Sequence, residues 1–482
     1  MFPRILLIFA LMALAGVVGC SGDDDIPEPT EGLSFTLQMQ PRTIGPTEDR
    51  VRVPAPGPDY RAIITISDNR RDDEPDAETV RRRRECRDGD YYFMAAGNDS
   101  ERGEQADGCR LLASFEDQGE FTTWVEIRGD DGEVVAGSDT QPARVRDFLI
   151  VSLGDSVASG EGNPDQGRLR TLFGDETVWQ DRQCHRSFRA GSAQAALEIE
   201  SADPDTTVTF LHLACSGARI TTGLLREYRG IESGDPLPPQ IAQLRALLED
   251  PGIGGSPEAP REVDALMLTI GANDLRFGTI VQRCLLNDED EGSCQAAPFR
   301  GEETVQQAVD RLLLDLDGRY ARLAACLGDG DCEAGEPLGI PSERVLISEY
   351  FDPSQSRPGR FCRYPTVPLP RFNLTRNESR WAKASVVDPL NAQVAASAGS
   401  FGWTHVDGLS ADFGTHGICR TFISRWVLRL SRSVTRQLGV AGAFHPNRRG
   451  HSCYRNRFTH ALRGTLGDEL EGEFTEREEC VS

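Results

Sequence analysis

From Phe148 onward, short apolar runs alternate with longer stretches of helical pattern, and this alternation constrains the fold more than any other feature. Short apolar runs bounded by turn signals are typical of strands buried on both faces. Strands that alternate with helices indicate a parallel sheet with helices on both sides. We therefore predict a three-layer α/β/α domain over residues 147–482, with a five-stranded parallel sheet. The expected strands are 148–153, 208–213, 264–270, 344–350 and 401–406, and the expected helices are 189–201, 239–249, 302–326, 388–398 and 421–437.

A different pattern occupies residues 33–146, where apolar and polar residues alternate with period two, as in Phe121–Arg128. This period is typical of strands with one buried face. The stretch from Gly119 to Val135, with a turn at 129–132, resembles the last hairpin of an immunoglobulin-like or PKD-like sandwich. We predict a separate all-β sandwich domain over residues 33–146.

The chain begins with a short apolar run, Ile5–Val18, which is typical of a secretory signal. The run ends at Val-Val-Gly-Cys, which resembles the bacterial lipobox, in which the cysteine is acylated and becomes the new N-terminus. We therefore expect residues 1–19 to be removed, Cys20 to carry lipid and residues 20–32 to form a flexible tether. This predicts a lipoprotein on the cell envelope, facing the periplasm or the exterior.

The formal net charge of −24 disfavours nucleic acid and anionic lipid surfaces as partners. The run Arg81–Arg84 is a basic block that we interpret as a solvated loop. We expect a monomer with no nucleic-acid partner.

Thirteen cysteines leave twelve once the acylated Cys20 is set aside, and an even number in an exported chain indicates structural disulfides. No cysteine or histidine cluster has the spacing of a zinc site, and a calcium site at 329–331 lacks a full ligand pattern. We expect neither a metal nor a cofactor. Neighbouring cysteines suggest the pairs Cys86 with Cys109, Cys184 with Cys215, Cys284 with Cys294, Cys326 with Cys332, Cys362 with Cys419, and Cys453 with Cys480.

Chemically versatile residues follow three of the predicted strands, at the edge where open parallel sheets bind ligands. Ser156 lies in Gly154–Gly162 after the first strand, Gly217 follows the second, and Asn273 follows the third. A serine nucleophile needs a base, and the oxyanion that it produces needs hydrogen-bond donors. The Ser156 and Gly217 N–H groups and the Asn273 amide are candidate donors.

A histidine base is available near the C-terminus, where Phe444–His451 contains two histidines. The segments GDSVASGEG, CHRS, ACSGA, GAND, FGTHGIC and FHPNRRGH occur in the order found in SGNH (GDSL-type) hydrolases, and resemble the secreted actinobacterial lipases and esterases of this group. The resemblance spans about 147–460 and implies a flavodoxin-like fold. It implies that Ser156 is the nucleophile, that Ser156, Gly217 and Asn273 form the oxyanion hole, and that His445 is the base.

The resemblance also assigns packing roles to other residues of these motifs, because His185 and His416 flank cysteines and His451 follows on a helix. Asp155 is expected to orient the turn. Many SGNH enzymes have an aspartate three residues before the histidine, but this chain has Gly442 there.

The replacement of that aspartate by Gly442 leaves open what orients the His445 ring. The Gly442 carbonyl is one candidate acceptor for the ring, and a carboxylate from Asp407 or Asp412 is the other.

These motifs predict a lipid-anchored serine hydrolase that cleaves carboxylic esters through an acyl-enzyme. The ester, whether lipid, phospholipid or acylated glycan, stays open. The alternative is a surface lipoprotein that keeps the fold as a binding or adhesion module and has lost its chemistry. Retention of the serine, glycine, asparagine and histidine together favours the enzyme.

Overall fold

The computed structural model describes residues 27–42, 60–68, 91–96, 104–106, 109–115, 117–129, 132–167, 177–203, 205–286, 293–369, 372–467, 470 and 480. The predicted signal segment, Cys20, Arg81–Arg84 and Cys86 lie outside these residues. The chain divides into two compact units. The first consists of Met1–Leu37, Ile63–Ser114 and Glu120–Ala143, and the second of Gln38–Ala62, Phe115–Gly119 and Arg144–Ser482.

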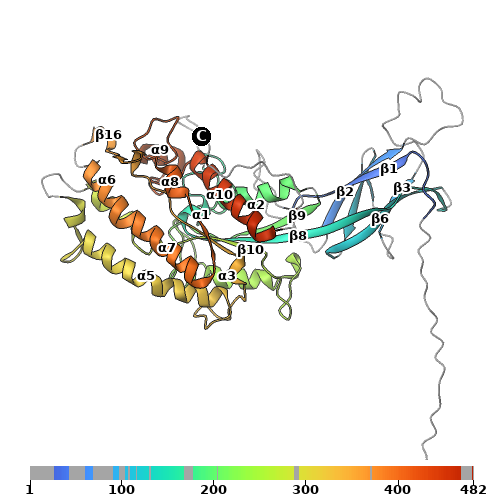
Figure 1. Ribbon diagram of the computed structural model, residues 1–482, viewed down its shortest axis with the longest axis horizontal. Helices are drawn as coiled ribbons and strands as arrows, with labels where there is room; N and C mark the ends of the chain where they lie inside the picture. Colours follow the sequence, from blue (N-terminus) through green and yellow to red (C-terminus); the bar gives the residue numbers. More distant parts are fainter. Residues whose placement is uncertain are drawn as a thin grey trace, which may run out of the picture. The chain divides into compact units, whose positions relative to one another are not determined.

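The second unit is built on five parallel strands in the spatial order β9-β8-β10-β13-β18. Figure 1 labels the first three of them. Their chain order is that of flavodoxin-like sheets, in which the second strand lies outside the first. Every residue of β9, β10 and β13 is buried, as expected for strands covered on both faces. The bounds are β8 (Gln141–Gly154), β9 (Thr206–His212), β10 (Ala265–Thr269), β13 (Val345–Ser348) and β18 (Thr404–Val406).

Strand β8 is longer than predicted and belongs to a mixed sheet. It begins at Gln141, and the division between the units falls within it, after Ala143. Antiparallel strands β6 and β3 continue the sheet beyond β8, and β7 pairs with β6. The first residues of β8 alternate in burial, and those from Asp147 onward are continuously buried. The apolar run in the sequence, which starts at Phe148, therefore marks only the second part of the strand. The five parallel strands are confirmed, within a sheet of eight.

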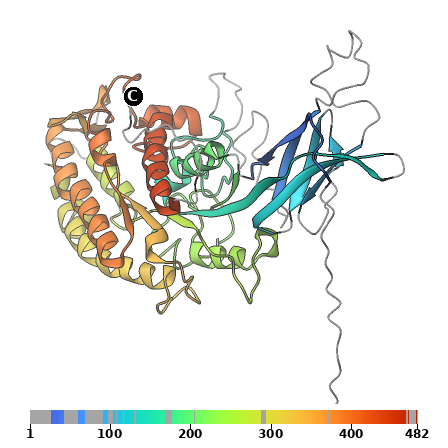
Figure 2. The ribbon, with the colours of Figure 1, turned by 45° about the vertical axis from the view of Figure 1, so that its right-hand side comes forward.

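Helices cover the parallel strands on both sides. Helix α10 packs against α2, and α5 packs against α7, with the two pairs on different sides of the strands (Figures 1 and 2). No helix in the described ranges is both long and apolar enough to cross a membrane. The helices are α1 (Ser156–Ser159), α2 (Gly191–Ala202), α3 (Gln240–Leu248), α4 (Phe277–Leu286), α5 (Val305–Leu327), α6 (Arg376–Ala382), α7 (Asp388–Phe401), α8 (Leu409–Phe413), α9 (Leu430–Gln437) and α10 (Arg448–Leu466).

The predicted helix over 421–437 is wrong in its first half, because α9 begins only at Leu430. Val427 forms an antiparallel bridge with Pro446, and the Leu428 N–H donates to the His445 carbonyl over 2.8 Å. Backbone groups that bond to a distant segment are not available to a helix, so tertiary pairing overrides the local helical pattern here.

The first unit is all-β in the residues described. Strand β2 alternates strictly between buried and more exposed residues, which explains the period-two pattern of its sequence. The predicted hairpin turn after Arg128 joins β6 to β7 in antiparallel register. The strands are β1 (Leu33–Met39), β2 (Tyr60–Asp68), β3 (Tyr91–Ala96), β4 (Glu104–Ala106), β5 (Arg110–Phe115), β6 (Gly119–Arg128) and β7 (Val134–Gly137), and the division assigns one end of β1, β2, β5 and β6 to the second unit.

Short two-stranded hairpins complete the second unit. They are β11 (Pro298–Arg300) with β12 (Glu303–Thr304), β14 (Gln355–Arg357) with β15 (Arg360–Phe361), and β16 (Tyr364–Leu369) with β17 (Phe372–Leu374).

Candidate active site

Ser156 lies directly after the carboxyl end of β8 and is the first residue of α1. The Asp155 carboxylate caps this helix by accepting the Val157 N–H over 3.0 Å, and it also accepts the Tyr350 hydroxyl. Complete burial raises the pKa of Asp155 to about 7, against these hydrogen bonds, which lower it. Asp155 therefore holds the turn that presents Ser156, as expected from the sequence.

His445 reaches Ser156 across the fold. Its Nε2 lies 2.7 Å from the Ser156 Oγ, which is hydrogen-bond distance for a base and a nucleophile. The pKa of His445 is lowered from 6.5, mainly by burial. A neutral imidazole is the form that can accept the serine proton.

The acceptor for the other ring nitrogen is not the residue predicted. The Nδ1 of His445 lies 3.1 Å from the Ala443 carbonyl, whereas the Gly442 carbonyl accepts the backbone N–H of His445 over 3.2 Å. A backbone hydrogen bond within the turn thus occupies the Gly442 oxygen, and the Ala443 carbonyl faces the ring. A main-chain acceptor replaces the missing aspartate, as predicted in kind, but one residue further along the chain.

Neither predicted carboxylate contacts the imidazole. Asp412 accepts two hydrogen bonds from the Arg457 guanidinium, over 2.8 and 2.9 Å. Asp407 and Asp412 act on the pKa of Glu349, and no hydrogen bond joins either to His445 within the described ranges.

Main-chain pairing and close packing hold the His445 loop in place. The Phe444 N–H donates to the Leu428 carbonyl over 2.9 Å, and the Leu428 N–H donates to the His445 carbonyl. Gly162, with φ of +93°, lies so close to this loop that a Cβ would be 2.4 Å from the Pro446 carbonyl oxygen. A glycine is required there both for its backbone conformation and for the approach of the loop.

The predicted oxyanion donors come from three separate segments. In the described part of the chain, the backbone N–H groups of Ser156 and Gly217 donate to no other atom. The Asn273 Nδ2 donates to the Ala218 carbonyl over 3.1 Å, which places its amide beside the Gly217 segment and leaves its second hydrogen available. Gly217 has φ of +83°, and the Tyr228 hydroxyl occupies the space that a Cβ would need.

Glu161 and His185 form a buried acid–base pair next to Ser216, and the sequence motifs did not identify this pair as functional. The Oε2 of Glu161 contacts the His185 Nδ1 at 2.8 Å and accepts the Ser216 hydroxyl at 2.7 Å. Burial acts against the charged form of both partners, but their mutual contact outweighs it, so the pKa of Glu161 is lowered and that of His185 is raised. The charge of Glu161 also raises the pKa of His445, against the effect of burial.

The Glu161–His185 pair is visible in the sequence only as parts of two separate motifs, GDSVASGEG and CHRS. Trp179 stacks on the His185 ring at 4.5 Å, and the Glu232 carboxylate contacts the His185 Nε2 at 3.1 Å. His185 therefore has a defined electrostatic role in addition to the packing role that was expected.

The other two histidines of the motifs have structural contacts. The Nδ1 of His451 accepts the Gly191 N–H over 3.3 Å and its Nε2 lies 3.1 Å from the Glu161 carbonyl. Burial lowers the pKa of His451 to about 4. His416 stacks on Trp426 at 3.7 Å. Both roles agree with the prediction.

Five of the predicted disulfides are present. Cys184–Cys215 braces the oxyanion segment, because the Ser216 N–H, next to Cys215, donates to the Cys184 carbonyl over 2.9 Å. Cys109 is also disulfide-bonded, but its predicted partner Cys86 lies outside the described residues. The five are Cys184–Cys215, Cys284–Cys294, Cys326–Cys332, Cys362–Cys419 and Cys453–Cys480.

One group of three candidate metal ligands occurs among the described residues: Asp412, Cys453 and Cys480. The two cysteines are joined in a disulfide, so they offer no thiolate to an ion.

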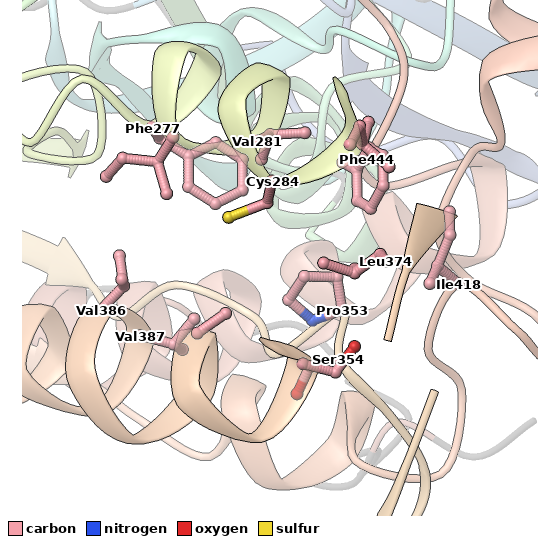
Figure 3. A pocket seen from close by; sticks show the side chains of 14 residues that line it. Phe277, Val281, Cys284, Pro353, Ser354, Leu374, Val386, Val387, Ile418 and Phe444 are labelled. Carbon is pink, nitrogen blue, oxygen red and sulfur yellow. The ribbon is translucent and has the colours of Figure 1, made fainter. Parts of the chain in front are cut away.

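An apolar pocket lies among α4, the segment around Val386 and Val387, and Phe444 (Figure 3). One wall comes from α4, which follows Asn273, and includes Phe277 and Val281. Opposite lie Val386 and Val387, and Phe444, the residue before His445, closes one end. Phe444 thus joins the lining of the pocket to the loop that carries His445.

The family model that describes GDSL-like lipases and acylhydrolases matches residues 152–453, which include all six sequence motifs and the four predicted site residues Ser156, Gly217, Asn273 and His445. This chain belongs to that family. It is accordingly an ester hydrolase, and the family assignment made from the motifs is confirmed.

Comparison with solved structures finds matches of low sequence identity and low TM-score. An extracellular lipase from Streptomyces rimosus is 19% identical with a TM-score of 0.41, covering 65% of this chain and 99% of that one. Phospholipase A1 from Streptomyces albidoflavus is 18% identical with a TM-score of 0.40, covering 66% and 99%. A carbohydrate acetylesterase family member from Sinorhizobium meliloti is 11% identical with a TM-score of 0.31, covering 66% and 99%. A comparison with curated proteins finds no match.

Proposed function

We propose that this GDSL hydrolase cleaves carboxylic esters through an acyl-enzyme on Ser156, with His445 as the general base. The observation that carries the proposal is the 2.7 Å approach of His445 Nε2 to Ser156 Oγ. In the first step the Ser156 oxygen attacks the ester carbonyl carbon while its proton passes to His445. The tetrahedral oxyanion receives hydrogen bonds from the Ser156 and Gly217 N–H groups and the Asn273 amide.

Release of the alcohol and hydrolysis of the acyl-enzyme use the same groups. The bond from carbon to the leaving oxygen breaks as His445 returns its proton to that oxygen, and the alcohol departs. Water then attacks the acyl-enzyme and loses a proton to His445. His445 passes this proton to the Ser156 oxygen as the bond from that oxygen to the acyl carbon breaks, which releases the carboxylic acid and restores the Ser156 hydroxyl. During each step the Ala443 carbonyl holds the Nδ1 hydrogen, so Nε2 stays free to take the proton.

The pocket favours an ester with an apolar acyl or alkyl chain over an acetylated glycan. Its lining is nearly all aliphatic or aromatic, and burial of methylene groups in such a lining contributes about 0.8 kcal/mol each. An acetyl group offers too little apolar surface to use this contribution. We therefore propose that lipid-type esters are the substrates.

The test is hydrolysis of p-nitrophenyl acetate and p-nitrophenyl octanoate by the wild type and by Val386→Phe. Val386 is 2% exposed and lines the pocket, so a larger side chain should fill the space of the octanoyl chain. We expect kcat/KM for octanoate to fall at least ~10-fold and that for acetate to change little. Leu314→Phe, at an 83% exposed position on α5, is the control. Equal kcat/KM values for the two esters in the wild type would contradict the proposal of a lipid-type ester.

The binding-module alternative makes an opposite prediction about chemistry. If the protein only binds, purified wild type and Ser156→Ala should hydrolyse either ester at the same background rate. A burst of p-nitrophenol in proportion to the enzyme, absent in Ser156→Ala, would exclude this alternative.

We also propose that Cys20 carries lipid and that residues 33–146 form an immunoglobulin-like domain. The lipobox-like Val-Val-Gly-Cys sequence supports the first, and the antiparallel strands β3, β6 and β7 support the second. The disulfides indicate an exported protein, since such bonds persist in oxidising compartments. Mass spectrometry of the native N-terminus tests the lipid: an unmodified Cys20 would contradict the proposal.

A further inference from the structure

The segment 420–440 has the opposite charge to the rest of the protein. It includes α9, which is labelled in Figure 1. The chain carries a formal net charge of −24, but no aspartate or glutamate occurs between Asp412 and Asp468. That interval contains ten arginines: Arg420, Arg425, Arg429, Arg432, Arg436, Arg448, Arg449, Arg455, Arg457 and Arg463. The net charge of the whole chain therefore conceals a strongly positive region.

The same segment exposes large apolar side chains. Phe422 is 66% exposed and Ile423 is 73% exposed. Five of the eight large apolar side chains that are exposed in the described part of the second unit lie in this one segment. The five are Phe422, Ile423, Val434, Leu438 and Val440, and the other three are Ile231, Leu286 and Leu314. We call these five side chains, together with Arg432 and Arg436, the 420–440 face.

The arginines of this face are not used to neutralise carboxylates. The Arg432 guanidinium lies over the Phe422 ring at 5.2 Å, so a cation and an exposed aromatic ring are adjacent. Within the described ranges no ion pair involves Arg432 or Arg436. Nearby Arg425 is buried, and burial, followed by repulsion from Arg429, lowers its pKa to about 10. The positive charge is thus crowded and available to an anion.

The 420–440 face is joined directly to the catalytic loop. Residues Val427 and Leu428 pair with Pro446 and His445 through the backbone. At the end of α9, the Gln437 side chain fills the space beside Gly442, so closely that a Cβ there would be 1.9 Å from the Gln437 Oε1. Whatever binds this face is therefore held next to His445.

We propose that the 420–440 face docks the enzyme on an anionic phospholipid bilayer. The aromatic and aliphatic side chains enter the boundary between headgroups and acyl chains, and Arg432 and Arg436 contact lipid phosphates. Nucleic acid and acidic glycans satisfy the charge but offer no apolar layer for Ile423, Leu438 and Val440. The net charge of −24 does not exclude an anionic lipid surface as a partner of this region, because it is an average over regions of opposite charge.

Vesicle binding tests the proposal without depending on catalysis. The protein is the chain 20–482 carrying Cys20→Ser, which excludes an acyl anchor, and Ser156→Ala, which prevents lipid hydrolysis. It is sedimented with vesicles of phosphatidylcholine alone or of a two-to-one mixture of phosphatidylcholine and phosphatidylglycerol. We expect binding to the mixed vesicles that weakens with salt. Failure of the catalytic proposal would leave this result unchanged.

Two pairs of substitutions locate the surface. Arg432→Gln with Arg436→Gln should weaken binding to mixed vesicles about 25-fold, at about fivefold per arginine. The matched control is Arg226→Gln with Arg322→Gln, which changes the net charge equally at two arginines that pair with Glu333. Control binding should stay within about twofold.

Phe422→Ser with Ile423→Ser should weaken binding about 10-fold or more, against Leu314→Ser as the apolar control. Restored to Ser156, this double variant should keep its turnover of a soluble p-nitrophenyl ester, which shows that it is folded. Equal binding to both kinds of vesicle, no difference between face and control variants, or binding to an oligonucleotide or heparin but not to vesicles would each overturn the proposal.

Discussion

His445 Nε2 lies 2.7 Å from Ser156 Oγ, although 289 positions of sequence separate the two residues. One residue follows the first parallel strand and the other lies on a loop that pairs with 426–428. The proposed proton transfer requires both residues, and two distant parts of the chain bring them within hydrogen-bond distance.

Ser156→Ala and His445→Ala should each lower kcat by at least ~10³-fold, because they remove the nucleophile and its base. Asn273→Ala should lower kcat on the order of 10²-fold, as expected for loss of one oxyanion donor. Steady-state hydrolysis of a p-nitrophenyl ester measures these changes. An organophosphate should label the wild type and Ser159→Ala but not Ser156→Ala, and near-normal turnover in Ser156→Ala would contradict the mechanism.

Asp407→Asn and Asp412→Asn should each leave kcat within about tenfold of the wild type. The His445 Nδ1 faces the Ala443 carbonyl, so neither carboxylate orients the ring. Loss of a triad aspartate costs about 10⁴-fold in kcat. A decrease of that size in either variant, with an unchanged circular dichroism spectrum, would replace the backbone-supported dyad with a triad.

Glu161→Gln should move the acidic limb of kcat/KM to lower pH and reduce kcat on the order of tenfold. Activity needs neutral His445 and is lost as pH falls through its pKa, which burial places below 6.5. The Glu161 charge stabilises the imidazolium and raises that pKa, so its removal lowers the pKa further.

The isosteric control for Glu161→Gln is Glu232→Gln, which removes a partly exposed carboxylate from the far side of His185. Glu232→Gln should shift the acidic limb of kcat/KM by less than Glu161→Gln does. An acidic limb that moves to higher pH in Glu161→Gln would show that Glu161 does not act on His445 through its charge.

Replacement of Cys184 and Cys215 by serine should lower both stability and activity. The 31-residue separation predicts a loss of about 3 to 4 kcal/mol in the free energy of unfolding, measured by urea denaturation. Activity should fall under conditions where the variant is still folded, because the bond braces the Gly217 segment. Serine replacement of Cys326 and Cys332, which close a shorter loop away from the site, should lower stability by about 2 kcal/mol and spare activity.

The sequence alone determined the parallel strands and the family, and it predicted Ser156, Gly217, Asn273 and His445 as the site residues. Buried strands leave apolar runs that can be recognised locally, and the residues at strand ends occur in short motifs. Cysteine pairing followed from proximity in the chain, since neighbours such as Cys326 and Cys332 close short loops.

Only the tertiary structure decided which carbonyl faces the His445 ring, because a turn with a positive φ at Phe444 selects Ala443 over Gly442. The start of α9 depended on bonds between 426–428 and the catalytic loop, which compete with local helix formation. The ion pair of Glu161 with His185 and the 420–440 face likewise arise from packing. All of these features depend on burial and on contacts between separate segments. Burial and such contacts are not properties of residues that are adjacent in the chain.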